Sequence, residues 1–489
     1  MPVRLDVPAL LAKLSVLPRR ITADSRRVEP GVAFAAYPGM HADGRKFVPD
    51  AITRGACAVL WEARAFQWDP KWNVPNLGVE SLQSRLGHIA DFVYGSPSKR
   101  LWITGVTGTN GKTSCAQWIA QAFDACGRRA AILGTLGNGL VGALTPATHT
   151  TPDVAVLHEL LAQFHAAGAQ AVAMEVSSHG LDQGRVNGVK FDVALFTNLT
   201  RDHLDYHRTM AAYGAAKAQL FTWPGLRAAI INADDPFGQS LIDGARARGQ
   251  RILTYGFANA DIAATAITMD RTGILLEVGT PWGRAMLTSP VVGVFNAQNL
   301  LGVLGVLLAS DVPLDQAVMA LAGLSAPPGR MQRFGGSGRP LVVVDYAHSP
   351  DALEKVLIAL KPAVADAGEL VCVFGCGGDR DPGKRPQMGG IAARLADRVV
   401  VTSDNPRGEE PAIIASAIVK GIRDTGNRRW SIENDRRAAI RGAVAAAKAG
   451  DVVLIAGKGH ETFQERNGQR TPFSDAAEAE AALAAWSGA

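Results

Sequence analysis

The sequence predicts a three-domain α/β protein whose central domain holds a mostly parallel sheet covered on both faces. Its 489 residues are too many for one hydrophobic core and are typical of about three domains. From residue 99 onward, short apolar β-rich runs alternate with helical patterns, as parallel sheets require. Clusters rich in Ser, Pro and Gly at 96–98 and 326–338 interrupt this order. We therefore place the domains at 1–97, 98–334 and 335–489.

Composition and charge narrow the class of protein. Hydrophobic residues make up 47% of the chain and charged residues 19%, and no apolar run is long enough to span a bilayer. The net charge of +5 is spread thinly, which favours a phosphorylated small substrate over nucleic acid. No Cys or His pair lies near Cys372 and Cys376, so we expect buried, reduced thiols. No signal peptide pattern opens the sequence. We expect a soluble cytoplasmic monomer without a nucleic-acid partner or membrane insertion.

The N-terminal domain is expected to be a small α/β unit. Strands are expected at 21–27, 31–37, 56–61 and 74–79, separated by turn residues. Polar loops at 21–26 and 39–44 carry hydroxyl and charged groups that suit a polar ligand. Ordinary solvated turns would have the same composition, so both interpretations stay open.

The stretch ITGVTGTNGKTS, residues 103–114, is the feature around which we expect the chain to be organised. An apolar run, a glycine-rich loop and a helical run at 115–123 follow one another, an order that turns backbone N–H groups toward phosphate oxygens. Lys112 would reach the outer phosphates, and the Thr113 hydroxyl would hold Mg²⁺. The strict G-x-x-x-x-G-K-[ST] pattern fails, because Val106 stands where its first glycine belongs. A glycine-rich turn without this function is the alternative.

Polar residues follow several strands expected in the central domain. These strands are expected at 101–104, 130–133, 171–176, 193–199, 228–232 and 251–255. Ligands of open parallel sheets gather outside the carboxyl ends of the strands. Glu175 and His203 stand at or shortly after two such ends, where a carboxylate and an imidazole could complete a metal site. Alternatively, Glu175 is a strand-end charge in water and His203 is a helix-cap residue.

The last third of the chain repeats the α/β alternation. A helix is expected at 296–308, and strands are expected at 341–344, 369–374, 398–402 and 451–456. The last three strands end in GCGGDRDPGK (375–384), SDNPR (403–407) and GKGHE (457–461). The GGSG segment at 335–338 is interpreted as a flexible linker and hinge.

Taken together, these motifs resemble the Mur ligase family, the ATP-dependent amide-bond ligases of peptidoglycan precursor synthesis. TGTNGKT at 107–113 matches the family's ATP loop, which explains why the strict pattern fails. The resemblance implies a central P-loop-type sheet, a smaller N-terminal UDP-substrate-binding domain and a C-terminal Rossmann-like domain that binds the amino acid. It implies ATP as co-substrate and Mg²⁺ as cofactor. The implied ATP-binding residues are Gly108, Thr109, Asn110, Gly111, Lys112, Thr113, Asn299, Arg330 and Asp345, and His348 belongs to the same match.

Within the family, the chain resembles the branch that adds the third peptide residue to UDP-N-acetylmuramoyl-L-alanyl-D-glutamate. HTTPD (149–153), EVSSHG (175–180), the Lys217 segment and DNPR (404–407) carry this resemblance. DNPR implies meso-diaminopimelate rather than lysine, because the planar fork of Arg407 suits the extra carboxylate. Glu461 would pair with the distal ammonium group. The implied amino-acid-binding residues are Arg380, Asp404, Asn405, Pro406, Arg407, Gly457 and Glu461. A plain Asx-Pro turn at 404–407 is the alternative.

The resemblance also implies a UDP-substrate site and a modified lysine. The implied UDP-substrate residues are Ala23, Ser25, Met40, His41, Ala42, Thr150, Thr151, Ser177, Gln183 and Arg185. Met40 and His41 depart from the expected family side chains, so we expect backbone contacts there. Lys217 corresponds to the family's carbamylated lysine (N6-carboxylysine), which would share a second Mg²⁺ with Glu175 and His203. A surface lysine in a salt bridge is the alternative.

The implied reaction is an ADP-forming ligation through an acyl phosphate. The D-glutamate carboxylate would take the γ-phosphoryl group of ATP, and the diaminopimelate amine would then displace phosphate. Lys112, Lys217, Glu175 and His203 are the implied catalytic residues, and closure of the third domain would exclude water.

Three other functions are alternatives to a Mur ligase activity. A folylpolyglutamate-type ligase shares the ATP loop and the carbamylated lysine, but HTTPD and DNPR argue against it. An ATPase that drives movement would hydrolyse ATP without any amino acid. A catalytically silent nucleotide-binding module would bind without turnover, and the intact catalytic set argues against it.

Overall fold

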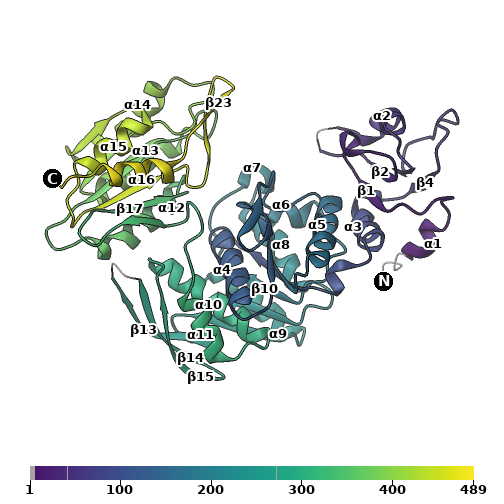
Figure 1. Cartoon of the computed structure of the whole chain (residues 1–489), viewed down its shortest axis with the longest axis horizontal. Coiled ribbons are helices and arrows are strands. Elements are labelled where there is room, and N and C mark those ends of the chain that lie inside the picture. Colours follow the sequence, from purple (N-terminus) through teal and green to yellow (C-terminus); the bar gives the residue numbers. More distant parts are fainter. Residues whose placement is uncertain (1–5, 41, 271–272, 489) are drawn as a thin grey trace. The chain divides into compact units, whose positions relative to one another are not determined.

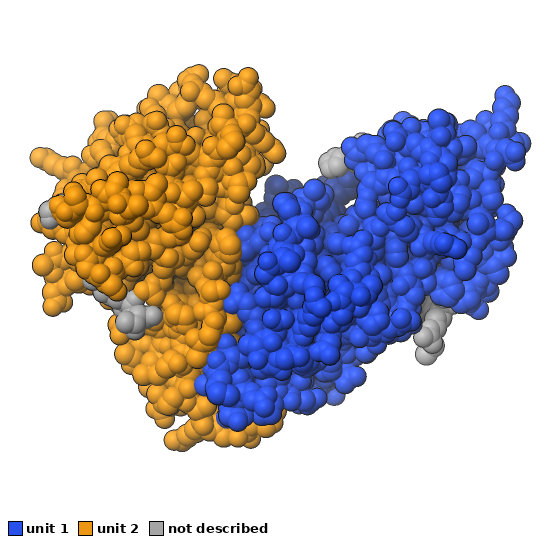
Figure 2. All heavy atoms as spheres, in the orientation of Figure 1, with its two compact units in different colours: residues 1–263, 301–320 blue, residues 264–300, 321–489 orange. Residues whose placement is uncertain are grey.

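The computed structural model describes residues 6–40, 42–270 and 273–488. The chain divides into two compact units, coloured separately in Figure 2. Unit 1 contains residues 1–263 and 301–320, and unit 2 contains residues 264–300 and 321–489. In the part of the chain that is described, no helix is both long and apolar enough to cross a membrane.

A four-stranded parallel sheet in the order β1-β2-β3-β4 forms the N-terminal part of unit 1. Its elements are α1 Val7–Leu11, β1 Arg20–Thr22, β2 Val32–Ala36, α2 Val48–Thr53, β3 Ala58–Glu62, β4 Asn76–Val79 and α3 Leu82–Val93. Side chains alternate along β2, so Ala33 and Ala35 pack with α1 and α3, while Phe34 and Ala36 pack with α2. The expected strands are confirmed, although β1 ends early because a 3₁₀ turn begins at Ser25.

The central sheet of unit 1 is built around parallel strands in the order β12-β11-β10-β5-β9-β6. Its strands are β5 Trp102–Thr107, β6 Ala130–Gly134, β7 Gly137–Leu140, β8 Ala143–Thr145, β9 Ala171–Glu175, β10 Val193–Phe196, β11 Ala228–Asn232 and β12 Ile252–Gly256, and β13 Ile262–Met269 begins in unit 1 and continues in unit 2. Its helices are α4 Lys112–Ala125, α5 Val154–Ala166, α6 Ser178–Asp182, α7 Leu204–His207, α8 Met210–Ala218 and α9 Pro236–Ala247. The expected strands are confirmed, and β7 and β8 extend β6 by antiparallel pairing.

Helices cover the central sheet on both faces, as the apolar strands predicted. On one face, side chains of α5 and α9 join the core formed by alternate residues of β5, β9, β10 and β11. On the other face lies α10 Val294–Ala309, the helix expected at 296–308. A Cβ added to Gly302 would lie 3.1 Å from the side chain of Leu195, and one added to Gly305 would lie 2.8 Å from that of Ile230. The two glycines therefore let α10 approach the sheet closely.

A sheet extension that the sequence did not predict follows β12. Strand β13 pairs in parallel with β12, and the hairpin β14 Ile274–Thr280 and β15 Gly283–Ser289 continues the sheet order in unit 2. Helix α11, Leu314–Ala322, follows α10.

The C-terminal sheet of unit 2 has the order β16-β17-β21-β18-β19-β20 and is parallel except for its edge strand β16. Its strands are β16 Gln332–Gly335, β17 Leu341–Asp345, β18 Leu370–Phe374, β19 Arg398–Val401, β20 Trp430–Ile432 and β21 Val452–Ala456, followed by the hairpin β22 Phe463–Arg466 and β23 Gln469–Pro472. Its helices are α12 Pro350–Leu360, α13 Lys384–Leu395, α14 Pro411–Arg423, α15 Arg436–Ala445 and α16 Asp475–Ala484. Helices α12, α13 and α14 cover one face, and α15 and α16 cover the other (Figure 1).

The structure corrects the second predicted linker, whereas the domain boundaries stay a prediction. Strand β16 begins at Gln332 and pairs with β17, so 335–338 is the turn of a hairpin within the C-terminal sheet. The interpretation of this GGSG segment as a linker and hinge is therefore wrong, and the expected boundary at 335 falls inside a strand. Residues 96–98 are packed: Pro97 and Ser98 are buried, and the Ser98 hydroxyl accepts a hydrogen bond from the backbone N–H of Lys190.

Candidate active site

The glycine-rich loop connects β5 to α4, as predicted. Gly108 has φ +152°, and a Cβ there would lie 1.9 Å from the Thr197 hydroxyl oxygen, so only glycine fits. Asn198 holds the loop from the end of β10. Its carbonyl oxygen accepts from the Thr109 N–H at 2.8 Å, and its Oδ1 accepts from the Asn110 N–H at 3.0 Å. The loop is thereby fixed at the N-terminus of α4, where a helix favours anions.

Glu175 is buried at the carboxyl end of β9, with 1% of its surface exposed. Its Oε2 accepts from the Thr113 hydroxyl at 2.9 Å, and its Oε1 accepts from the Thr135 N–H at 2.7 Å. A Cβ on Gly134 would lie 2.2 Å from Oε1, so the glycine lets the carboxylate approach β6. The alternative of a strand-end charge in water is wrong. Carboxylate and hydroxyl oxygens are ligand types that Mg²⁺ prefers, so this pair fits the predicted metal.

Two lysines converge on the carbonyl oxygen of Gly108. Lys112 donates to it at 2.9 Å and Lys217, from α8, at 2.7 Å. Lys217 is 1% exposed and lies 4.4 Å from the ring centre of Tyr213. Burial, and then the charge of Lys112, lower the pKa of Lys217 well below its usual value. The alternative of a surface salt bridge is wrong.

Three imidazoles gather in the same part of unit 1. The ring of His203 lies 5.0 Å from that of His179 and 6.0 Å from that of Tyr213, and His179 lies 5.4 Å from His207. Burial, followed by His203 and His207, lowers the pKa of His179 to about 4. His203 occupies the N-cap position of α7 without a capping hydrogen bond, and burial lowers its pKa, with Lys112 and Lys217 acting in the same direction. Burial therefore favours the uncharged form of these imidazoles.

The predicted UDP-substrate residues of the central domain form one network. Arg185 donates to the Thr151 carbonyl at 3.0 Å and to Gln183 Oε1 at 2.9 Å, and Thr151 and Ser177 share a 3.0 Å hydroxyl contact. Gln183 also donates to the sulfur of Met40, at 3.2 Å. The network thus reaches the N-terminal loop that contains Met40 and Ala42, and Thr150 contacts the Thr135 hydroxyl at 3.0 Å beside Glu175. Ala23 and Ser25 adjoin β1, and His41 lies outside the described residues.

Three predicted nucleotide residues belong to unit 2. Asp345, at the end of β17, accepts from the N–H groups of Met331 and Ala347 at 2.8 Å each, and burial raises its pKa. The guanidinium of Arg330 lies 4.7 Å from the Tyr346 ring centre, and its Nε is buried with no hydrogen-bond partner among the described residues. Asn299 donates to Asn296 Oδ1 at 3.2 Å within α10. A buried donor without a protein partner can donate a hydrogen bond to a bound ligand.

The predicted amino-acid residues gather at the carboxyl ends of β18, β19 and β21. Asn405 donates to Glu461 Oε2 at 2.8 Å, and Arg407 donates to the Gly378 carbonyl at 2.8 Å. A Cβ on Gly457 would lie 2.6 Å from Asp404 Oδ2. A Cβ on Gly377 would lie 2.9 Å from a guanidinium nitrogen of Arg407 and 3.7 Å from Arg380 Cγ, while Pro406 lies within the same loop. The structure therefore brings this predicted set together.

A fully buried ion pair, Arg436 with Asp475, contacts the backbone of the loops after β19 and β21. Arg436, at the start of α15, donates twice to Asp475 at 2.7 Å, and both side chains are 0% exposed. The same guanidinium donates to the carbonyls of Ser403 at 3.2 Å and Ala456 at 3.0 Å. Those carbonyls immediately precede Asp404 and Gly457, so Arg436 fixes both loops to one point.

The sequence interpretation missed several residues of these sites. Asn198 and Lys458 lie inside stretches that were recognised as polar strand ends, although neither was assigned a role. Thr135 and the Arg436–Asp475 pair lie outside every motif. In the described ranges, no three His, Cys, Asp or Glu side chains are grouped so as to hold a metal. The assignment of Mg²⁺ to Thr113, Glu175, His203 and Lys217 stays a prediction.

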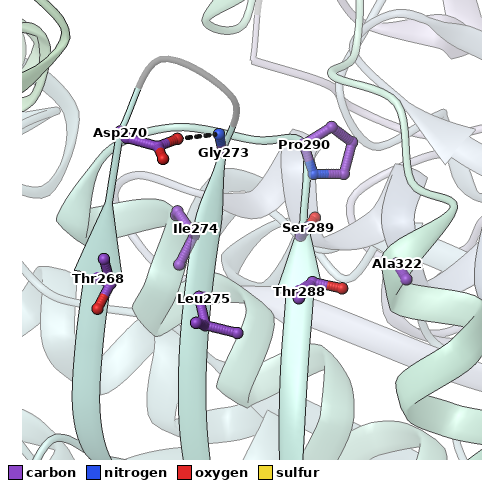
Figure 3. Close-up of a pocket in the computed structure, with 9 residues that line it drawn as sticks. All are labelled: Thr268, Asp270, Gly273, Ile274, Leu275, Thr288, Ser289, Pro290 and Ala322. Carbon is purple, nitrogen blue, oxygen red and sulfur yellow. Dashed lines mark hydrogen bonds between the residues drawn. The ribbon is translucent and has the colours of Figure 1, made fainter.

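A cavity of about 440 Å³ in unit 2 is separate from these clusters. It lies along the ends of β13, β14 and β15 (Figure 3). Its lining consists of Thr268, Asp270, Gly273, Ile274, Leu275, Thr288, Ser289, Pro290 and Ala322. None of the predicted site residues belongs to it.

Three family profiles match the chain in order. "Mur ligase family, catalytic domain" matches residues 19–94, "Mur ligase middle domain" matches 106–307, and "Mur ligase, glutamate ligase domain" matches 329–459. Two similar curated proteins are both named UDP-N-acetylmuramoyl-L-alanyl-D-glutamate–2,6-diaminopimelate ligase. The one from Chromobacterium violaceum is 52% identical over 98% of this chain and 97% of its own length. The one from Pseudomonas aeruginosa is 50% identical over 99% of each. A solved structure of a protein with that name is 39% identical, with a TM-score of 0.72 over 96% of this chain and 95% of the other.

Proposed function

The chain belongs to the Mur ligase family, and from this we propose that it joins meso-diaminopimelate to UDP-N-acetylmuramoyl-L-alanyl-D-glutamate, with ATP converted to ADP and phosphate. The reaction serves peptidoglycan precursor synthesis, and we expect a monomer acting in the cytoplasm. The observation that carries the amino-acid choice is the cluster in unit 2, where Asn405 bonds to Glu461 and Arg407 is held by the Gly378 carbonyl. A guanidinium beside a carboxylate is complementary to a substrate end with both an acidic and an amino group.

The residues of unit 1 supply positioning and charge for phosphoryl transfer. The D-glutamate carboxylate attacks the γ-phosphorus, the bond to ADP breaks, and an acyl phosphate forms. Lys112 neutralises charge on the transferring group, which is the main requirement of such reactions. The loop residues Gly108 to Thr113 hold the phosphates, and Asn299, Arg330 and Asp345 are further nucleotide contacts. The amine of diaminopimelate then attacks the acyl carbon, loses a proton, and displaces inorganic phosphate.

Lys217 is proposed to act as a carbamate. A neutral amine is required for attack on CO₂, and burial, which lowers the pKa of Lys217, favours that form. The bond forms between Nζ and the carbon of CO₂, and one proton leaves the nitrogen. Thr113, Glu175, His203 and the carbamate would hold Mg²⁺, which would supply positive charge beside the phosphates.

The proposed UDP-substrate residues are the network from Thr151 to Arg185 together with Ala23, Ser25, Met40, His41, Ala42 and Thr150. Its members connect the end of β9 to the N-terminal domain. Such a surface suits a long substrate whose nucleotide lies far from its reacting carboxylate.

Phosphate release by the purified protein tests this function. The reaction contains ATP, Mg²⁺ and UDP-N-acetylmuramoyl-L-alanyl-D-glutamate, with meso-diaminopimelate or L-lysine offered in parallel. We expect release with diaminopimelate and much less with lysine. Preference for lysine would contradict the role of Arg407, and equal release without any amino acid would favour an ATPase.

A further inference from the structure

Lys458 is a fully buried lysine of unit 2 that lies beside the proposed amino-acid-binding residues. It follows β21 directly after Gly457, one of the proposed amino-acid-binding residues. Its side chain is 0% exposed. Lysine is rarely buried to this extent, because an ammonium group must replace its water with hydrogen-bond partners. Those partners indicate what the side chain does.

Lys458 joins two segments of the amino-acid cluster. Its Nζ donates to Asn405 Oδ1 at 3.0 Å and to Glu461 Oε2 at 2.7 Å. Asn405 lies in the loop after β19, whereas Glu461 lies in the turn after β21. One ammonium group therefore sets the relative positions of two proposed substrate contacts.

The same contacts determine which way the Asn405 amide points. Its Oδ1 also accepts from the Glu465 N–H at 2.9 Å, and its Nδ2 donates to Glu461 Oε2 at 2.8 Å. In the reversed orientation, the NH₂ group would face two donors and the oxygen would face a carboxylate. Lys458 thus excludes the reversed amide.

Lys458 also determines what Glu461 presents to a ligand. Both hydrogen bonds that Glu461 accepts from described side chains use Oε2. The Glu461 side chain is 23% exposed, so Oε1 is the oxygen available to a ligand. The charges of Lys458 and Glu461 cancel. The charged side chains that remain in the proposed amino-acid set are then Arg380, Arg407 and Asp404, which carry no excess negative charge.

We propose that Lys458 is a positioning residue that fixes Asn405 and Glu461 and, by cancelling the charge of Glu461, favours a substrate end with both charges over an end with an ammonium alone. This inference rests on the proposed function. The distal end of diaminopimelate carries a carboxylate and an ammonium and is neutral, whereas the end of lysine carries only an ammonium. A pocket without excess negative charge offers the lone ammonium little compensation for its lost water.

The test compares wild type with Lys458→Met, which keeps the length of the side chain and removes its charge and donors. Steady-state phosphate release gives KM separately for diaminopimelate, ATP and the UDP-linked substrate. We expect KM for diaminopimelate to rise about 10- to 100-fold, since hydrogen bonds to charged groups are lost. The other two KM values should stay within about twofold, because the affected contacts belong to the amino-acid cluster. The ratio of kcat/KM for diaminopimelate to that for L-lysine should fall, because Glu461 is no longer neutralised.

Lys355→Met is the matched control, because it removes an exposed lysine that pairs with Asp351 at 2.9 Å on α12 of the same unit. Its kinetics should equal those of wild type. If Lys458→Met does not fold, Lys458→Gln keeps an N–H donor while removing the charge, and the same direction is expected with a smaller rise.

The outcomes separate this inference from the proposed function. Wild type that does not use diaminopimelate would overturn the proposed function. Wild type that uses it, with a variant whose KM and amino-acid preference are unchanged, would overturn only the role of Lys458. Loss of stability with equal changes in all three KM values would show a purely structural role and would also overturn the proposal.

Discussion

Lys217 in unit 1 and Lys458 in unit 2 are both almost completely buried, yet their surroundings differ in charge. Lys458 pairs with the Glu461 carboxylate at 2.7 Å. Lys217 donates to the neutral Gly108 carbonyl and is close enough to Lys112 for that charge to depress its pKa. Burial alone therefore does not decide what a lysine does. The charge of the neighbouring groups separates Lys217, whose proposed role is chemical, from Lys458, whose proposed role is to hold other residues in place.

The largest expected effect comes from replacing Lys217, the proposed carbamate. Lys217→Met should lower kcat for ligation about 10³-fold, because the carbamate and the charge that it positions are lost. Its fold should be retained, since the methionine fills the same space without an unpaired amine. Phosphate release measures kcat, and circular dichroism shows whether the fold is retained.

Lys190→Met is a suitable control in the same unit. Lys190 pairs with Asp192 at 3.1 Å and is about one-third exposed, so its replacement should change kcat by less than about twofold. Nearly normal activity of Lys217→Met would contradict the proposed chemical role of Lys217, which is what distinguishes it from Lys458.

Replacing Arg436 of the buried Arg436–Asp475 ion pair should have the next largest effect. We expect it to lower the stability of unit 2 rather than the rate of the reaction. Arg436→Met leaves Asp475 buried without its cation and should cost about 3–5 kcal/mol. The double variant Arg436→Met with Asp475→Leu should recover much of this loss. Hydrogen exchange of unit 2 measures the change without treating the whole chain as one folding unit.

An exposed pair provides the comparison for Arg436. Arg429 and Glu369 lie 2.8 Å apart at the surface of the same unit, and Arg429→Met should cost less than about 1 kcal/mol. Equal losses in Arg436→Met and Arg429→Met would contradict the anchoring role of the buried pair.

The two sites also differ in how far they could be predicted from sequence. Strands are continuous apolar runs, so β11 was predicted at 228–232 and found at Ala228–Asn232. The rule that ligands gather at strand ends selected Glu175 and His203, and the family resemblance of DNPR selected Asn405. The glycines at 335–338 were misinterpreted, because a flexible linker and a hairpin turn have the same composition.

Side-chain direction could not be predicted. Lys458 lies within the recognised GKGHE stretch, but no local pattern shows that its ammonium turns inward to Asn405. Arg436 and Asp475 start separate helices and meet only because α15 and α16 cover the same face of the sheet. The sequence indicates where polar chemistry gathers, and packing determines which groups pair.

Stability should change in opposite directions when each buried lysine is replaced. Lys458→Met removes one of the two donors to Asn405 Oδ1 and the only cation paired with Glu461 among the described residues, and should destabilise unit 2 by about 1–3 kcal/mol. Lys217→Met removes a buried amine that has no carboxylate partner at hydrogen-bond distance among the described residues, and should leave unit 1 unchanged or slightly more stable in CO₂-free buffer. Hydrogen exchange measured on each unit would report both. Equal destabilisation of the two units would mean that the charge of the group bonded to each lysine does not determine how much the lysine contributes to stability.

The smallest expected effect is a pH dependence that belongs to Lys217. Because its folded-state pKa lies below the unfolded value of 10.5, the native state binds fewer protons than the unfolded state between these two values. The stability of unit 1 should therefore rise with pH through that window in CO₂-free buffer, and Lys217→Met should remove this slope while Lys458→Met keeps it. Added bicarbonate should raise the stability of the wild type in this window without removing the slope, since carbamate formation acts on the folded amine by mass action and leaves the native state with fewer bound protons than the unfolded state. Hydrogen exchange of unit 1, corrected for the intrinsic pH dependence of exchange, measures the slope. An identical slope in wild type and Lys217→Met would show that the buried amine titrates as it does in water.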